Sequence, residues 1–139
     1  MFDLVRQAIE TEFDTKWTAL ANGIALAFGN EQFTGGLDWA RISVMFAQSH
    51  QASIGDPALE KYPGLVSVQI FTAKGRGSAR GLVLADSAAG ILRRKALTLS
   101  GVTIYFGVPY LETVGERTDY QQTNLVAPFE AQAVLAAAT

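Results

Sequence analysis

Cysteine is absent from the 139-residue sequence, and histidine occurs once, at His50. Without cysteine the chain forms no disulfide and offers no thiolate ligand or nucleophile, and a single histidine excludes a multi-histidine metal centre. Charged residues make up 17% of the chain, below the value of about 25% that is usual for soluble globular proteins. We therefore expect no metal or other cofactor. We also expect part of the surface to be covered by something other than water.

Long hydrophobic runs and excess charge are absent too. No apolar stretch approaches the roughly 18 residues that a membrane-spanning helix needs. The formal net charge is −2, which gives no general case for nucleic-acid binding. About half of the residues, 49%, are hydrophobic, enough for a core without covalent cross-links. The length indicates one domain over residues 1–139, because most domains have 50–200 residues.

The spacing of apolar residues predicts the elements of the fold. Helices are predicted where apolar residues recur every three or four positions, over residues 2–17 and 78–95. Strands are predicted from alternation or from short apolar runs, over residues 24–28, 39–46, 65–73, 102–106 and 120–129. Pro128 indicates that the last strand ends or lies on an edge near that point. This order favours an α+β fold in a single domain, with a mixed or antiparallel β-sheet and two α-helices packed on one face.

Three segments lack a clear period. Residues 47–64 are weakly patterned and are predicted to form a long loop or arm, which in a compact domain is often functional. Residues 108–119 are predicted as a polar loop, and the alanine-rich residues 131–139 as a frayed tail.

A glycine-rich turn follows the second predicted long strand. Gly75, Gly77 and Gly81 resemble a nucleotide-binding loop, but their spacing differs by one residue from the dinucleotide fingerprint, and the Gly-Lys-Ser/Thr of a phosphate loop is missing. A tight turn from strand to helix needs glycine in any case. We therefore interpret these glycines as structural.

Two single residues stand out as candidates for a partner surface. His50 has no second titratable group tied to it by spacing, so a solvated histidine is favoured over a general base. Phe33 lies beside Gly35 and Gly36 in a predicted loop, and it fits the core pattern least well of the aromatic residues. An exposed aromatic side chain of this kind is typical of an anchor at an interface.

Opposite charges gather in two predicted loops. Lys74, Arg76 and Arg80 surround the glycine-rich turn, and Glu112 and Glu116 lie in the segment over residues 108–119. Each group is equally compatible with a solvated surface. As an interface hypothesis, the two groups form a complementary pair between neighbouring subunits.

Several stretches, in their order and spacing, resemble the tail terminator family of long, non-contractile-tailed phages and phage-derived particles. The resemblance covers most of the chain and is weakest over residues 47–64 and the last ten residues. Its segments are Trp39-Ala40-Arg41-Ile42-Ser43-Val44, Val68-Gln69-Ile70-Phe71, Gly75-Arg76-Gly77, Leu84-Ala85-Asp86, Ser100-Gly101-Val102, Gly107-Val108-Pro109 and Tyr120-Gln121-Gln122-Thr123-Asn124-Leu125-Val126-Ala127-Pro128-Phe129.

The resemblance implies a structural role in the virion, at the end of the tail nearest the head, after assembly in the host cytoplasm. Such proteins form a six-fold ring on the tail tube, stop its polymerisation and meet the connector proteins of the neck. DNA passes through the ring without sequence-specific contact, and nothing is catalysed. The arm over residues 47–64 is then expected to dock onto the last ring of tube subunits.

Elementary geometry is compatible with a ring. A chain of this length has a radius of gyration near 14 Å, so six roughly 35–40 Å globules leave a central hole of about one globule. Ring closure needs a head-to-tail contact between two different surfaces. The alternatives are another neck or tail component, such as a head-closure ring, a connector ring or the tube protein, a small nucleotide-hydrolysing enzyme, and a dimeric binding domain.

Overall fold

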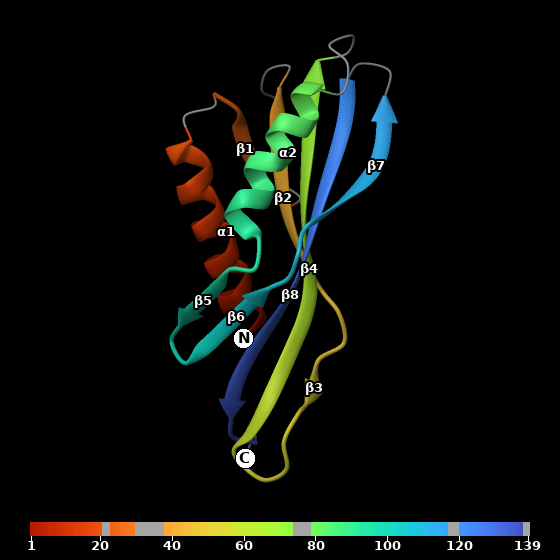
Figure 1. The fold of residues 1–139 in the computed structure, drawn as a ribbon. Coiled ribbons are helices and arrows are strands. Elements are labelled where there is room, and N and C mark those ends of the chain that lie inside the picture. The colour runs from red at the N-terminus through yellow and green to blue at the C-terminus, as the bar shows by residue number, and fades with distance from the viewer. Residues whose placement is uncertain (21–22, 30–37, 74–78, 117–119, 138–139) are drawn as a thin grey trace.

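Two helices and eight strands make up the computed structural model, which describes residues 1–20, 23–29, 38–73, 79–116 and 120–137 (Figure 1). The helices are α1 (Phe2–Ala19) and α2 (Ala79–Leu92). The strands are β1 (Ala25–Phe28), β2 (Trp39–Phe46), β3 (His50–Gln51), β4 (Ala58–Ala73), β5 (Ala96–Leu99), β6 (Val102–Phe106), β7 (Tyr110–Glu116) and β8 (Tyr120–Leu135).

All of the strands belong to one mixed sheet, in the order β1-β2-β4-β8-β6-β5, with β3 added to β4 and β7 added to β8. Only β1 and β2 are parallel, and every other pair is antiparallel. The centre of the sheet is the β4–β8 pair, whose 16-residue strands match residue for residue from Ala58↔Leu135 to Ala73↔Tyr120.

Both helices pack on one face of this sheet and share its core. On α1 the buried residues recur once per turn, at Val5, Ile9, Phe13 and Trp17, as the apolar spacing predicts. The buried residues of both helices join alternate residues of the central strands in one hydrophobic cluster. The predicted α+β class, with two helices on one face of a mixed sheet, is therefore confirmed.

Two prolines sit inside the long strands, at positions where the neighbouring strand changes. Pro63 of β4 lies between the residues that pair with β2 and those that pair with β3, and its carbonyl accepts a hydrogen bond from Ala47 N at 2.9 Å. Pro128 of β8 lies between the β7 and β6 pairings, and its carbonyl accepts from Gly107 N at 2.8 Å. A missing N–H costs no ladder bond at such gaps, so both strands continue through their prolines.

The structure corrects three predicted loops. Residues 47–64 contain β3 and the first part of β4, so the arm is a β-structure. Residues 108–119 contain the edge strand β7. The predicted frayed tail is also wrong as far as Leu135, because β8 extends to that residue. The end of β8 is formed by pairing with the distant start of β4, whereas β3 and β7 each pair with the strand that follows them. In each case the strand depends on its partner, which local sequence patterns do not record.

The second helix ends earlier than predicted. It stops at Leu92, and Arg94 has a φ of 47°, a left-handed conformation that interrupts a helix. The Arg94 N–H donates to the Gly107 carbonyl at 3.0 Å. A short strand that the sequence did not predict, β5, follows at once and pairs with β6.

Candidate interaction surfaces

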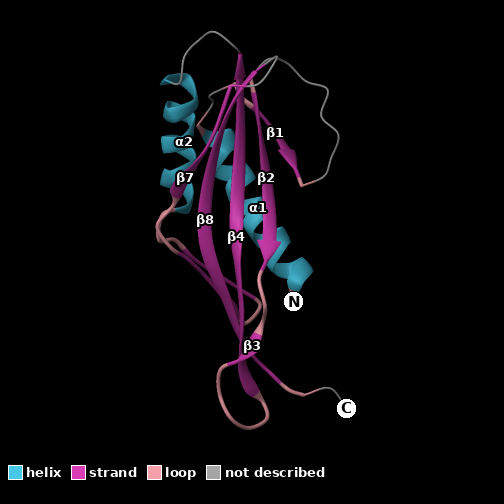
Figure 2. Ribbon diagram, turned by 90° about the vertical axis from the view of Figure 1, so that its right-hand side faces the viewer, coloured by secondary structure: helices cyan, strands magenta, loops and turns pink. Residues whose placement is uncertain are grey.

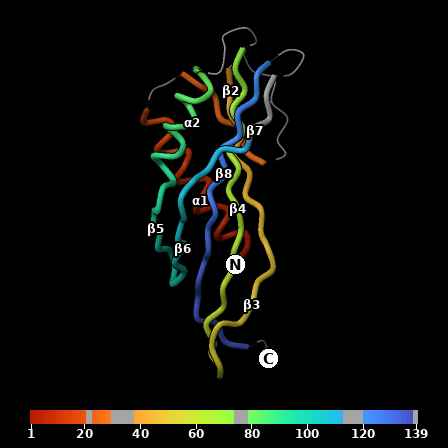
Figure 3. The backbone as a smooth tube through the Cα atoms, turned by 45° about the vertical axis from the view of Figure 1, so that its right-hand side comes forward, coloured from red at the N-terminus to blue at the C-terminus, as the bar shows by residue number. Residues whose placement is uncertain are grey.

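A β-arm extends beyond the helices at one end of the molecule (Figures 1 and 3). It consists of β3, residues 58–63 of β4 and residues 130–135 of β8. In Figure 2 the helices lie beside the rest of the sheet, and only the start of α1 meets the arm, where Phe2 packs against Tyr62. Alternate side chains of the arm, those of Ala58, Tyr62, Ala131 and Ala133, are buried, and those between them are half-buried or exposed. We predict from the sequence that the first part of this arm, within residues 47–64, contacts the tail tube.

Hydrogen bonds fix the tip of the arm. Ser53 Oγ accepts from Leu59 N at 2.7 Å, and the Ser53 carbonyl accepts from Gln51 Nε2 at 2.7 Å. Asp56 accepts from the N–H of Ala137 at 2.7 Å, which ties the tip to the chain beyond β8. Between these contacts Ile54 is fully exposed. The tip is thus a held loop that displays one large apolar side chain to solvent.

His50 is exposed on the arm, opposite Lys61 in the pairing of β3 with β4. It lines a shallow hollow of about 220 Å³ with Ser49, Gln51, Glu60 and Tyr62. The structure places His50 on the arm, and its role at a partner surface stays a prediction.

In the same hollow, the Tyr62 hydroxyl donates a hydrogen bond to the Glu60 carboxylate. That hydrogen bond, followed by burial and by the charge of Glu60, raises the pKa of Tyr62. The pair joins the arm to the body, because the Tyr62 ring also packs edge-on against Phe2 of α1 with centroids 5.3 Å apart.

Among the basic candidates, Arg80 lies in the first turn of α2 and points toward the start of β2. Its Nε atom is 3.7 Å from Asp38 Oδ2, and the other Asp38 oxygen accepts from Ala73 N at 2.9 Å. Arg80 thus takes part in a contact within the chain. Lys74 and Arg76 lie outside the described residues, as does Phe33.

The acidic candidates both belong to β7. Glu112 is exposed and pairs in register with Asn124 of β8. Its neighbour Leu111 pairs with Leu125 of the hydrophobic core, so alternation along the strand turns Glu112 to the face without helices. Glu116 ends the strand, and its side chain lies outside the described part. Arg80 and Glu112 therefore lie on different sides of the subunit, and their pairing between subunits remains a prediction.

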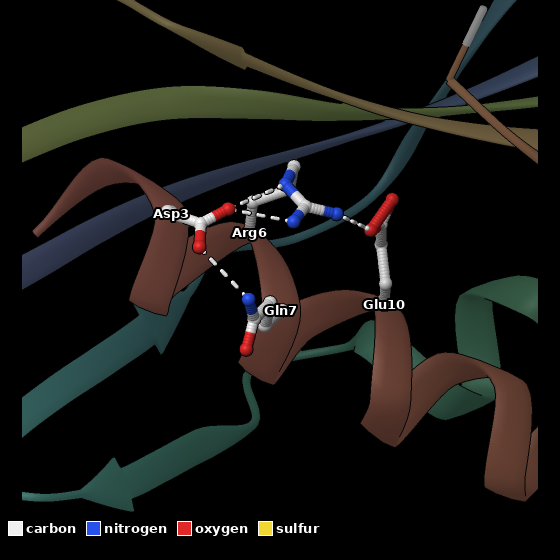
Figure 4. Close-up of polar contacts among 4 residues, drawn as sticks. All are labelled: Asp3, Arg6, Gln7 and Glu10. Atoms are coloured by element: carbon white, nitrogen blue, oxygen red, sulfur yellow. Dashed lines mark hydrogen bonds and ion pairs between the residues drawn. The ribbon is translucent and has the colours of Figure 1, made fainter.

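An open hollow of about 690 Å³ lies along the polar face of α1 and includes Phe28 and Gly29. Asp3, Arg6, Gln7 and Glu10 form a connected polar row there (Figure 4).

Within this row, Arg6 Nη2 is 2.6 Å from Asp3 Oδ1, and Arg6 Nη1 is 2.5 Å from Glu10 Oε2. The hydrogen bond that Arg6 donates to Asp3 and the charge of Glu10 raise the pKa of Arg6. Such exposed pairs at three- and four-residue spacing stabilise a solvated helix face.

Two general features complete the description of the surface. Among the described residues, no three histidine, aspartate or glutamate side chains gather as a metal ion would require. Neither α1 nor α2 is long and apolar enough to cross a membrane.

Comparison with known proteins gives one informative result. No family model matches the chain. No curated protein matches it either. A solved structure is similar over 95% of this chain and 96% of its own, with a TM-score of 0.74 and 18% sequence identity. The name of that protein states no function. At this level of identity the likeness concerns the fold alone.

Sequence reasoning found the arm as a segment but missed its structure and its tip. The signal that was available is the stretch Leu59-Glu60-Lys61-Tyr62, in which only Tyr62 is buried, so the residue types show no strict alternation. Ile54 could have been noticed as an isolated large apolar residue between Ser53 and Gly55.

Proposed function

We propose that the chain is a tail terminator, a structural virion protein that forms a ring on the head-proximal end of a phage-type tail tube. The ring ends tube polymerisation and offers its other side to the connector proteins of the neck. DNA passes through its centre. The protein works by binding and catalyses no reaction.

The resemblance to that family supports the proposal through the elements that carry it. Its described segments lie in β2, β4, α2 and β8, which form the centre of the sheet and its helical cover, and in the β5–β6 turn and the β6–β7 connection. The likeness therefore follows the scaffold of the domain. The arm, where the resemblance is weakest, contains the part of the surface that would adapt to a particular tube.

The β-arm is the single structural observation that carries the proposal furthest. A subunit that docks end-on to a tube needs a contact surface at one end of its long axis. The arm supplies one, with Ile54 fully exposed at a tip that three hydrogen bonds hold in place. An exposed apolar side chain on a held loop gains free energy when it enters a pocket, and little ordering entropy opposes the gain.

Native mass spectrometry tests the proposal. The purified chain is measured alone and after mixing with particle-derived tail tubes, and electron microscopy locates the bound protein. One six-fold ring at a single tube end is the expected result. Open-ended polymers would instead indicate a tube protein, and a dimer that ignores tubes would contradict the proposal.

The tip is tested by Ile54→Asp, with Leu20→Asp as the matched control at the far end of α1. Both residues are exposed, at 101% and 48%, so neither change should unfold the protein; the carboxylate at position 20, the C-cap of α1, should cost no more than about 0.3–1 kcal/mol. Ile54→Asp should abolish tube binding, while Leu20→Asp should bind as the wild type does. Equal tube binding by both variants would remove the arm from the contact.

A further inference from the structure

Helix α2 is apolar almost all the way around. Between its ends at Ala79 and Leu92, only Arg80, Asp86 and Ser87 are polar. Leu82 and Val83 are nonetheless exposed, at 42% and 58%. A helix with apolar residues on every side is normally covered on every side. The exposed side of α2 is therefore apolar but is not covered by any described part of the same chain.

Strand β7 adds to this surface from beside the helix. It pairs with β8, and no other strand of the described chain pairs with its outer edge. Val108, Tyr110 and Leu111 are exposed there, at 62%, 49% and 49%. A hollow of about 120 Å³ separates β7 from α2. We call the exposed apolar residues on the helix side, Leu82, Val83 and Leu111, the α2–β7 surface; Tyr110 alternates with Leu111 and lies on the other face of β7.

The size of the α2–β7 surface can be compared with that of known interfaces. Half-exposed side chains of this kind each show about 100 Å², so the three together show about 300 Å². That is the lower end of the range for the largest apolar patch of a typical monomer, about 300–600 Å². It is more than a third of the roughly 800 Å² that each partner contributes to a standard interface. The surface thus supplies the apolar centre of one side of a stable contact, and the strand edge adds main-chain pairing to it.

A second strand edge lies on the other side of the molecule. In Figure 1, β5 is at the left and β7 at the right. Strand β5 pairs with β6, and its outer edge has no further strand among the described residues. A hollow of about 310 Å³ lies between β5 and α1. We call its apolar lining the α1–β5 surface, which consists of Leu4, Ala8, Leu97 and Leu99.

Charge does not oppose an apolar contact between these two surfaces. The one carboxylate of the α1–β5 hollow, Glu12, is paired with Lys95, whose Nζ is 2.9 Å from its Oε1. The α2–β7 hollow contains one acid and one base, Asp86 and Arg93. Each surface is therefore close to neutral, and covering it would bury no charge of one sign in excess.

We infer that the α2–β7 surface of one copy binds the α1–β5 surface of the next copy, head to tail. Both surfaces combine a free strand edge of about four regular residues with an apolar groove beside a helix. The regular part of β7 ends at the bulge after Thr113, and β5 is four residues long. Free edges of this kind pair with another strand through the main chain.

The inference rests on the proposed ring, because two different surfaces on opposite sides produce a closed ring or an open chain, whereas one surface used twice produces a dimer.

Two charged variants test the inference, one on each surface. Val83→Glu alters α2–β7, and Leu99→Glu alters α1–β5. Leu20→Glu is the control, since Leu99 and Leu20 are similarly exposed, at 43% and 48%. Each surface variant should keep the wild-type melting temperature and self-associate at least about tenfold more weakly.

Mixing the two surface variants gives the decisive result. Each variant retains one intact surface, so the equimolar mixture should form a 1:1 heterodimer that grows no further in native mass spectrometry. If Leu99→Glu dimerises alone and the mixture adds nothing, α2–β7 binds itself and the inference is wrong. If both variants assemble as the wild type does, these surfaces bind another protein, and the inference is wrong again.

The two proposals fail separately. A wild-type chain that forms rings on tubes, while both variants also form them, would leave the terminator function intact and overturn the interface. Wild-type self-association that is indifferent to tubes, but lost in both variants, would support the interface and overturn the terminator function. A chain that stays monomeric, alone at millimolar concentration and with tubes, would overturn both.

Discussion

Gly64 lies where the sheet leaves no room for a side chain. It lies in β4, between Phe46 of β2 and Phe129 of β8 in the pairing register. A methyl group on Gly64 would meet the main-chain carbonyl oxygen of Met45 and would lie 2.5 Å from Cζ of Phe129. The Phe129 ring is itself fixed by Phe46 and Phe106, with centroids 5.8 and 6.2 Å away.

The cost of Gly64→Ala follows from these contacts. Overpacking a core costs about 1–3 kcal/mol, and the upper value applies because a main-chain carbonyl cannot rotate away. Alanine restricts the unfolded chain, which returns about 0.4–1 kcal/mol. The net loss of unfolding free energy is therefore about 2 kcal/mol. For a domain of this size it lowers the melting temperature by about 6–10 °C.

Calorimetry of Gly64→Ala tests this prediction, with an alanine substitution at a second glycine as the control. Gly90 is an exposed helical glycine with no atom within 4 Å of an added Cβ. Gly90→Ala should therefore raise stability by about 0.5–1 kcal/mol. Adding Phe129→Leu to Gly64→Ala relieves the ring but not the Met45 carbonyl, so the double variant should show less than the sum of the two losses. A Gly64→Ala protein that melts within about 2 °C of the wild type would refute the reasoning.

Three further changes test the core and the arm. Phe13→Ala removes a fully buried ring and should cost about 3–5 kcal/mol in urea unfolding; a loss below about 1 kcal/mol would place this side chain at the surface. Trp17→Phe deletes the indole N–H that donates to the Ile24 carbonyl at 3.0 Å and should cost about 1–3 kcal/mol, whereas an unchanged urea midpoint would contradict that bond. Tyr62→Phe removes a hydroxyl whose pKa is raised, first by its hydrogen bond to Glu60. A raised pKa stabilises the fold below the ordinary value of about 10. The difference in unfolding free energy between the wild type and the variant should therefore shrink as the pH rises above that value, and a difference that stays constant with pH would contradict this explanation.

The α+β class, both helices and most of the central strands could be predicted because their residues carry a local period. Helix α1 buries one residue per turn from Val5 to Trp17, and β2 alternates between its faces. The predicted C-terminal end of helix α2 was wrong, because nothing in the sequence Arg93-Arg94-Lys95 indicates the left-handed conformation of Arg94.

The arm and β7 could not be predicted in the same way. The first residues of β4 follow a proline and contain another, and prolines normally mark loops. Here Pro63 is tolerated because it faces the gap between β2 and β3, a gap that exists only once the sheet has formed. Strand β7 is likewise defined by its pairing with β8.

The charged candidate interface residues could be predicted from the sequence, and the apolar ones could not. The sequence identified charged residues, and the structure places Arg80 beside Asp38 and Glu112 on an exposed strand. It did not identify Val83 or Leu99, because an apolar residue in a helix or strand is normally assigned to the core. Which apolar residues remain uncovered depends on how α2 and β5 are set against the sheet.

The continuous β4–β8 ladder has a mechanical consequence. Both strands are described along their whole length and pair without a register shift, so they form a stiff rod of about 50 Å. Its one end is the arm, and its other end supports β7 and α2. A force on the tip of the arm is thus transmitted to the α2–β7 surface, where the next copy is proposed to bind. If tube docking strengthens the contact between neighbours by some factor, that contact strengthens docking by the same factor. A ring of such rods would close cooperatively on the tube and would release it as a unit.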